Sequence, residues 1–481
     1  MNEHRDESPD LGRDGLSERI AEVLPTARWF GDKDREVTAV TVGDLVAGTN
    51  GGVRVGWALA TVQFADGGHA EYGVPFVVRE GEIIPDAADE AFVAWWIGLV
   101  ASGVPVPSER GELTFTAMEG EHPWLAAAER EAGRVLAVEQ SNTSIRYGDI
   151  ALAKVFRRLG TGVNPDVEIT TRLAERTGFA QIARPLARVD HHADQHEMTV
   201  GFVQAWVPNQ GDGWSWILGA LHQWASGTPN SGEIGLVNRR RMLAAIRALG
   251  ERTGELHGAL ASAGTDPSFV PEPLSEAAID SLVRESTRLL EQTLQQLVAL
   301  EINDPATRIH VQRVIAREAE LRQRLEGFRA MAGNSAIRVH GDYHLGQVLR
   351  TEDDDWVILD FEGEPARPSE ERRRKHSALK DVGGMLRSFA YARGAALRDA
   401  AASGPSLPDT ALIPWEAEAR AAFIEGYRAR ARRSAVALVP DNDVAFRRAL
   451  DAWELDKALY EVRYELANRP DWLALPLAAL G

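Results

Sequence analysis

The chain has 481 residues, a formal net charge of −18 and no cysteine. A chain of this length exceeds what one hydrophobic core accommodates, so we expect two or three domains. The negative charge argues against a general nucleic-acid partner or an anionic membrane partner, because both of these surfaces are themselves negative. The lack of cysteine excludes disulfides, thiolate nucleophiles and cysteine–zinc sites.

The N-terminal region, residues 1–15, is polar and charged, which predicts a disordered tail. It has no apolar stretch of the kind that a secretory signal requires. The most apolar run of the chain, residues 91–100, is too short to span a bilayer. We therefore expect a cytoplasmic protein.

Strand patterns dominate the chain up to about residue 206, because apolar and β-branched residues alternate there between turn residues. Strands are expected at 52–65, in a segment ending near 78, and at 112–118, 135–140, 150–156, 185–189 and 198–206. A polar turn at 141–149 would join two of these strands. Short helices are expected at 88–102 and 168–176.

Helical periodicity dominates the remainder, and the change of character falls near residues 204–213. Helices are expected at 239–260, 275–300, 305–331 and from about 377 onward, with short strands at 336–340 and 356–360 between them. The sequence therefore predicts an α+β protein. Its regions are a tail (1–15), two β-rich regions (16–90 and 91–206) and a mostly helical region (207–481).

Two aspartates follow the two short strands of the helical region. Asp342 comes after the first strand and Asp360 ends the second. Phosphoryl transfer needs one carboxylate that orients and deprotonates the acceptor hydroxyl, and another that holds Mg²⁺ against the phosphates. If both strands belong to one hairpin, their separation is well defined, as positional catalysis requires. We predict that Asp342 is the base and Asp360 a metal ligand; the alternative is a hairpin with solvated turn carboxylates.

Two further side chains of this segment fit the same chemistry. Gln347 lies on the loop of Asp342, and its amide oxygen is a suitable second ligand for a hard cation such as Mg²⁺. His340 is expected to support the loop by hydrogen bonding rather than to react.

Lysine is scarce in this chain, with five lysines against 48 arginines. Lys154 nevertheless lies among bulky apolar residues in a predicted strand, where an unpaired ammonium would be costly to bury. Glu168 follows at the start of the next helix, so a Lys–Glu pair could aim the amine at nucleotide phosphates. The alternative is an edge strand with Lys154 in water.

The polar turn before Lys154 is a weaker signal. Kinases place a phosphate-covering loop at this point, and Ser141, Thr143 and Ser144 could bind phosphate through hydroxyl and backbone N–H groups. The turn lacks the usual glycine pattern, so an ordinary polar hairpin is an equal alternative. His191, His192 and His196 are expected to lie in a solvated loop between two strands rather than in a metal site.

Several segments resemble bacterial maltokinases, a family within the aminoglycoside-phosphotransferase-like superfamily. The similar segments span nearly the whole chain: ARWF (27–30), EQSNTS (139–144), 156–166, VPNQGDGW (207–214), HGDYHLGQ (340–347), DFEGEPARP (360–368), DVGGMLRS (381–388), DKALYE (456–461) and YELANRPDW (464–472). The resemblance implies a bilobal protein-kinase-like fold with a small cap subdomain, an intermediate subdomain that completes the N-lobe, and a helical C-lobe.

The resemblance also implies the transfer of phosphate from ATP to maltose, with Mg²⁺, to give maltose 1-phosphate for glycogen-like α-glucan. An association with trehalose synthase is possible in this family. By this resemblance, Asp342 is expected to be the base, and Gln347 and Asp360 the metal ligands. Lys154 and Glu168 are expected to form the pair that orients the phosphates. The adenine edge should meet the backbone around Gln204 to Trp206. We expect a monomer or a weak homodimer, with no nucleic acid and no membrane.

Sugar recognition requires aromatic faces and polar edges. The candidates are Tyr460, Glu461, Arg463 and Tyr464, for which a plain packed helix is an equal alternative, together with His344 and Glu362. Two rival functions remain open. The first is a kinase of glucosamine, another hexose or an aminoglycoside, for which Glu362 and Glu364 supply carboxylates. The second is a catalytically inactive glucan-binding or partner-binding module, against which Lys154, Asp342 and Asp360 argue.

Overall fold

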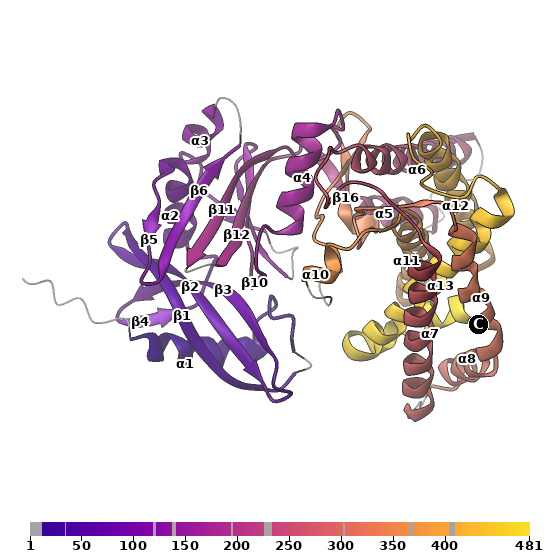
Figure 1. Ribbon diagram of the computed structural model, residues 1–481, viewed down its shortest axis with the longest axis horizontal. Coiled ribbons are helices and arrows are strands. Elements are labelled where there is room, and N and C mark those ends of the chain that lie inside the picture. Colours follow the sequence, from indigo (N-terminus) through magenta and orange to yellow (C-terminus); the bar gives the residue numbers. More distant parts are fainter. Residues whose placement is uncertain are drawn as a thin grey trace, which may run out of the picture. The chain divides into compact units, whose positions relative to one another are not determined.

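The computed structural model describes residues 12–33, 35–118, 122–136, 141–193, 196–225, 233–301, 304–364, 367, 369–403 and 409–481. The chain divides into two compact units (Figure 1). The first unit falls within Met1–Thr171, Ala183–Val207 and Pro365–Ser369, and the second within Arg172–Ile182, Pro208–Glu364 and Glu370–Gly481. Helices α4 (Pro165–Arg176) and α10 (Ser369–Arg372) are divided between them.

The first unit begins with a helix packed on an antiparallel sheet. Its elements are α1 (Arg13–Val23), η1 (Leu24–Thr26), β1 (Val37–Asn50), β2 (Val53–Phe64), β3 (His69–Arg79) and β4 (Glu82–Ile84), with β10 (Arg158–Leu159) joining β3 at the edge. Leu16 and Ile20 of α1 are fully buried with Tyr72 and Phe76 of β3, because alternate strand residues face the helix.

A second sheet of the first unit has seven strands in the order β5-β6-β11-β12-β9-β8-β7. These are β5 (Val106–Pro107), β6 (Gly111–Ala117), β7 (Arg134–Val135), β8 (Thr143–Tyr147), β9 (Ala151–Val155), β11 (Pro185–Ala193) and β12 (His196–Ala205). Helices α2 (Glu90–Ser102) and α3 (Pro123–Ala128) pack in one core with this sheet. Phe92 and Trp96 of α2 share one core with Trp57 of the first sheet and Tyr147 of the second, which joins the two sheets.

The second unit is mostly helical. Its helices are α5 (Gly213–Ala225), α6 (Glu233–Ala261), α7 (Glu276–Ala299), α8 (Pro305–Ala316), α9 (Glu318–Leu325), η2 (Glu326–Met331), η3 (Leu345–Gln347), α11 (Leu379–Ser403), α12 (Asp409–Ala431), α13 (Asp443–Asn468), η4 (Pro470–Trp472) and α14 (Ala474–Leu480). Within the described ranges, no helix combines the length and the apolar character needed to cross a membrane.

Two small antiparallel sheets lie among these helices. One has the order β13-β16-β17, with β13 (Asn209–Asp212), β16 (Val348–Thr351) and β17 (Trp356–Ile358). The other has the order β14-β15-β18, with β14 (Glu272–Pro273), β15 (Ser335–Ile337) and β18 (His376–Ser377). The β-rich first half and helical second half confirm the predicted α+β class.

Three local expectations were wrong. The strands expected at 336–340 and 356–360 do not form one hairpin, because β17 pairs with β16, a strand that the sequence analysis missed. The turn expected at 141–149 contains β8, which pairs with β7 and β9. The three histidines do not lie in a loop, since β11 and β12 include them and pair almost to their tip. His191 is fully buried.

Helices α6 and α12 cross in direct backbone contact, and glycine makes this possible. A Cβ atom on Gly250 would lie 2.1 Å from the carbonyl oxygen of Phe423, and one on Gly426 would lie 2.1 Å from that of Arg247. Glycine is unfavourable inside a helix, so its presence at both positions reflects the close approach of the two backbones.

We expect Gly250→Ala to lower the free energy of unfolding by about 1–3 kcal/mol, because the added methyl group meets backbone that has no rotamer to change. Chemical denaturation followed by the helical circular dichroism signal measures this. Gly258→Ala on the same helix is the matched control: no atom lies within 4 Å of its added Cβ. The free energy of unfolding of Gly258→Ala should rise by about 0.5–1 kcal/mol. Equal effects of the two substitutions would contradict the packing argument.

Candidate active site

The loop that carries Asp342 follows β15 and runs along the end of β17. Gly341 has a φ of +90°, and a Cβ atom there would lie 3.1 Å from the Cα atom of Gly363. A side chain at position 341 would therefore be strained and crowded at once. This glycine allows the loop after β15 to pass close to the segment after Asp360.

Asp342 forms an ion pair with a lysine that comes from α13. Lys457 Nζ lies 3.0 Å from Asp342 Oδ1 and 2.9 Å from Glu364 Oε1. Burial raises the pKa of Asp342, but the charges of Lys457 and His344 more than offset this, and the pKa lies below its usual value. Burial lowers the pKa of Lys457, whereas Asp342 and Glu364 raise it well above its usual value. Both groups are therefore charged, and Asp342 can accept a proton.

A small pocket opens beside this ion pair. Its lining consists of Gly341, Tyr343, Glu364, Lys380, Gly384, Trp453, Asp456 and Lys457. Lys380 Nζ lies 4.0 Å from the second carboxylate oxygen of Glu364. Glu364 is thus approached by two ammonium groups, and the pocket has charged groups beside the buried ring of Trp453.

Asp381, in the first turn of α11, binds the backbone of the loop that carries Asp342. Its carboxylate accepts hydrogen bonds from the backbone N–H groups of His340 (2.8 Å) and Gly341 (2.9 Å), and His257 Nε2 lies 3.0 Å away. Burial raises the pKa of Asp381, yet the hydrogen bond and charge of His257 offset this, and the pKa is lowered. Tyr427 Oη lies 3.1 Å from the other nitrogen of His257. The ionised carboxylate therefore fixes the backbone immediately before Asp342.

Asp360 and Gln347 are neighbours in the structure. Gln347 Nε2 lies 2.9 Å from Asp360 Oδ2, and the backbone N–H of Leu359 donates to the carbonyl of Gln347. His340 Nε2 lies 2.8 Å from the carbonyl oxygen of Leu359, in the supporting role expected of it. Asp360 has a φ of +65°, a region that L-residues rarely adopt and that is often found at functional sites.

This pair fits a magnesium ion by its chemistry. Mg²⁺ binds through oxygen atoms, commonly one or two carboxylates with further oxygens from water and phosphate. A half-turn of the Gln347 amide exchanges its nitrogen and oxygen, which would present an amide oxygen beside the carboxylate of Asp360. The assignment of both residues as ligands remains a prediction.

Lys154 lies in the interior of the second sheet of the first unit. Strand β9 is paired on both sides, with β12 and β8, so the edge-strand alternative is excluded. Lys154 Nζ lies 2.9 Å from Asp166 Oδ2, and both side chains are almost fully buried. The sequence analysis did not propose Asp166. Glu168, two residues further along α4, is half-buried, and its pairing with Lys154 remains a prediction.

The remaining predicted nucleotide contacts also lie in this sheet. Thr143 and Ser144 open β8 rather than a turn, and Thr143 Oγ1 accepts a hydrogen bond from Arg157 Nε at 2.9 Å. Ser144 lies opposite Lys154 in the β8–β9 register. Ser141 is exposed. Residues 137–140, which form most of the strand expected at 135–140, are outside the described ranges.

The predicted adenine-binding segment ends β12. Gln204 is buried, and the backbone N–H of Trp206 donates to the carbonyl of Ile150 at 3.0 Å. The guanidinium of Arg146 lies 3.9 Å from the ring centre of Trp206. Trp206 is therefore held by both its backbone and its ring.

The predicted sugar-binding residues of α13 separate into two faces. Tyr460 and Tyr464 stack with ring centres 6.4 Å apart, and Lys457 Nζ lies 4.7 Å from the ring centre of Tyr460. Glu461 instead pairs with Arg387 of α11 at 2.7 Å. Arg463 is exposed and lies 3.3 Å from Gln292 Oε1. The tyrosine face is thus continuous with the lysine that contacts Asp342.

The other two candidates lie on the loops around Asp342 and Asp360. His344 Nδ1 accepts a hydrogen bond from the backbone N–H of Gly346 at 3.0 Å, and burial lowers its pKa. Arg372 donates to the backbone carbonyl of Glu362 at 3.0 Å.

Sequence reasoning missed three residues around Asp342 in the second unit, Lys457, Asp381 and His257, and the partner of Lys154 in the first unit, Asp166. Lys457 had the same signal that singled out Lys154, since it is one of only five lysines. Asp381 and His257 are separated by 124 positions and meet only through tertiary packing, so no local pattern connects them.

Comparison with known proteins identifies the N-terminal region. Residues 24–104 match the model of the maltokinase N-terminal cap domain. A glucosamine kinase from Streptacidiphilus jiangxiensis is 27% identical over 413 residues, which cover 85% of this chain and 79% of that protein. A glucosamine kinase from Mycolicibacterium smegmatis is 27% identical over 350 residues, covering 72% and 78%.

Solved structures of glucosamine kinase share the fold. One crystal form superposes with a TM-score of 0.68 at 22% identity, covering 96% of this chain and 98% of the other. A complex with glucosamine, ADP and inorganic phosphate superposes with a TM-score of 0.65 over the same shares. The chain therefore carries a maltokinase-type N-terminal cap and has the kinase-like fold of glucosamine kinase, as its resemblance to maltokinases predicted.

Proposed function

We propose that this chain is an ATP-dependent sugar kinase, and that its acceptor is maltose, phosphorylated at the anomeric hydroxyl to give maltose 1-phosphate. The observation that carries the proposal is Asp342, held ionised by Lys457 beside a pocket with charged and aromatic walls. A general base needs to be ionised and within reach of the hydroxyl it deprotonates. The glucosamine kinase relatives and the matched cap support the same class of reaction.

Each residue has a definite part in the proposed reaction. Asp342 orients the acceptor hydroxyl and accepts its proton as phosphate is transferred, while Lys154 orients the nucleotide phosphates. Gln347 and Asp360 would hold Mg²⁺, which neutralises phosphate charge when bound. Asp381 acts on the backbone of the loop and is a positioning residue. Glu168, Ser141, Thr143, Ser144 and the segment Gln204 to Trp206 are the proposed nucleotide contacts.

The charges of the pocket favour an uncharged sugar. Glu364 and Asp342 are both approached by Lys457, and Glu364 also by Lys380. The ammonium group of an amino sugar would therefore add a third cation near carboxylates that already have partners. Tyr460 and Tyr464 offer aromatic faces for a second sugar ring. Within this proposal the product feeds α-glucan synthesis, with trehalose synthase as a possible source of maltose.

Glucosamine is the second candidate acceptor. The curated relatives that cover most of this chain are named glucosamine kinases, and Asp456 contributes a further carboxylate to the pocket. Recognition of an ammonium group by Asp456 is the specific interaction that this alternative requires.

Acceptor specificity can be tested with a panel of sugars and coupled detection of ADP. We expect kcat/KM to be higher for maltose than for glucosamine, glucose or an aminoglycoside, because only a neutral disaccharide uses both the pocket and the tyrosine face. Product analysis by NMR should show phosphate on the anomeric oxygen. Turnover of glucosamine without turnover of maltose would overturn the maltose assignment and leave the kinase assignment standing.

The base can be tested with Asp342→Asn, which keeps the size of the side chain and removes its basicity. We expect kcat to fall by about 10²- to 10⁴-fold. ATP affinity, measured by calorimetry, should change little, since the carboxylate acts on the acceptor. Undiminished turnover in this variant would refute the role of Asp342 and favour a different catalytic group.

The ion pair predicts a shift in the pH dependence of the rate. Lys457 lowers the pKa of Asp342, so Lys457→Met should raise that pKa. More of the base is then protonated at a given acidic pH, and the acid limb of kcat/KM should move to higher pH. Lys33→Met removes the same charge from an exposed position of the first unit and should leave the profile unchanged. An unshifted acid limb in the Lys457 variant would show that this pair does not control the base.

A further inference from the structure

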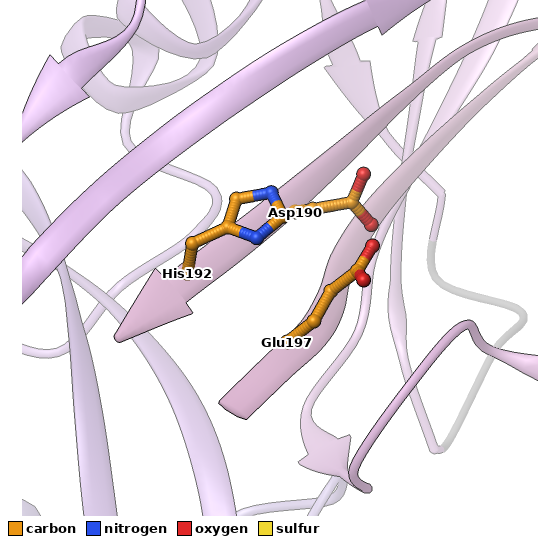
Figure 2. A group of neighbouring side chains, drawn as sticks. All are labelled: Asp190, His192 and Glu197. Atoms are coloured by element: carbon orange, nitrogen blue, oxygen red, sulfur yellow. The ribbon is translucent and has the colours of Figure 1, made fainter. Parts of the chain in front are cut away.

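A second cluster of ionisable side chains lies on the β11–β12 hairpin of the first unit, outside the machinery proposed above. Figure 2 shows Asp190, His192 and Glu197 on one face of the two strands, with the two carboxylates turned toward each other. Asp190 and His192 are two residues apart on β11 and therefore share a face. Glu197 lies directly opposite His192 in the strand register.

The ligand atoms of these three residues are close and chemically suited to a metal ion. One nitrogen or oxygen from each residue lies within 4.8 Å of the others. His192 Nε2 lies 3.0 Å from Thr114 Oγ1 of β6. When Nε2 carries the proton and donates to Thr114, Nδ1 keeps its lone pair; a hydrogen bond of this kind commonly orients a metal-binding histidine.

Asp190 carries a buried negative charge that its neighbours compensate incompletely. Its side chain is fully buried, and its Oδ1 accepts a hydrogen bond from Thr199 at 2.9 Å. Oδ2 accepts no hydrogen bond from any described residue: Arg188 Nε lies 2.9 Å away without the alignment of one. Burial accordingly raises the pKa of Asp190. Arg188 also lies 3.6 Å from Glu197, so one guanidinium serves two carboxylates.

We propose that Asp190, His192 and Glu197 bind a divalent transition-metal ion of the Zn²⁺ type, and that Arg188 compensates the carboxylates when the ion is absent. A nitrogen and two oxygens suit Zn²⁺ better than Mg²⁺, which takes oxygen ligands almost exclusively. Ligand atoms of a tetrahedral zinc site lie about 3.4 Å apart for bonds of about 2.1 Å. The ligand atoms here lie within 4.8 Å of one another, so the partly exposed side chain of Glu197 would have to move inward when the ion binds.

The site would join β11 to β12 near the tip of the hairpin, and so stabilise the sheet that contains Lys154. Its function is separate from the proposed phosphoryl transfer. A metal ion there needs no substrate, and a failure of the kinase proposal would leave it untouched.

The test is equilibrium dialysis of the full chain against Zn²⁺, with bound metal measured by mass spectrometry. We expect the wild type to bind one Zn²⁺ per chain more than His192→Gln. His196→Gln, which changes an exposed histidine of the same hairpin outside the cluster, is the matched control and should bind as the wild type does. Equal stoichiometry in the wild type and His192→Gln, or no Zn²⁺ bound at all, would overturn the proposal.

Arg188→Leu separates a metal site from a plain ion-pair network. Removing the guanidinium leaves two carboxylates without their cation, so the thermal midpoint of the metal-free variant should fall. Zn²⁺ should restore that midpoint and bind at least about tenfold more tightly than to the wild type, because a repelling charge is gone. A fall in the midpoint that Zn²⁺ does not restore, or a restoration that persists in Arg188→Leu/His192→Gln, would show that the cluster is an ion-pair network only.

Discussion

The candidate site around Asp342 depends on the hydrogen bonds between the buried carboxylate of Asp381 and the backbone of the loop. A charge in the protein interior is tolerated only when it is paired and hydrogen-bonded, and Asp381 obtains its partners from the backbone of the loop and from His257. The same bonds that stabilise the carboxylate therefore fix the backbone ahead of Asp342. Gly341 makes the arrangement sterically possible, because its positive φ and missing side chain let the loop pass the segment after Asp360.

Two buried lysines, one in each unit, follow one physical rule. Lys154 is buried against Asp166 in the first unit, and Lys457 is shared between Asp342 and Glu364 in the second. In a chain that otherwise uses arginine, each position calls for a compact ammonium group. An ammonium can contact two carboxylates from one point, whereas the planar guanidinium imposes a fork of fixed geometry. At Lys154 and Lys457 the compact shape of the ammonium group therefore matters.

The fold of this protein does not identify the sugar that it would bind. The kinase-like fold is shared with glucosamine kinases at 22% identity, but a common fold does not specify the sugar. In the function that we propose, the acceptor depends on a few side chains around Lys457, where ammonium and carboxylate groups would favour a neutral sugar over an amino sugar. Under the same proposal, the face formed by Tyr460 and Tyr464 would contact the second ring of a disaccharide.

The sequence by itself determined the α+β class and the positions of strands such as β2 and β3, and it singled out Lys154, Asp342 and Asp360 as candidate site residues. These follow from local periodicity, turn residues and the cost of burying charge, all of which act over short stretches of chain. Only the tertiary structure decided that β17 pairs with β16 and that Asp166 faces Lys154. It also decided that Asp381 binds the backbone before Asp342 and that Lys457 pairs with Asp342. Strand pairing and the partners of buried charges are contacts between residues distant in sequence. Their energies depend on distances that no local pattern contains.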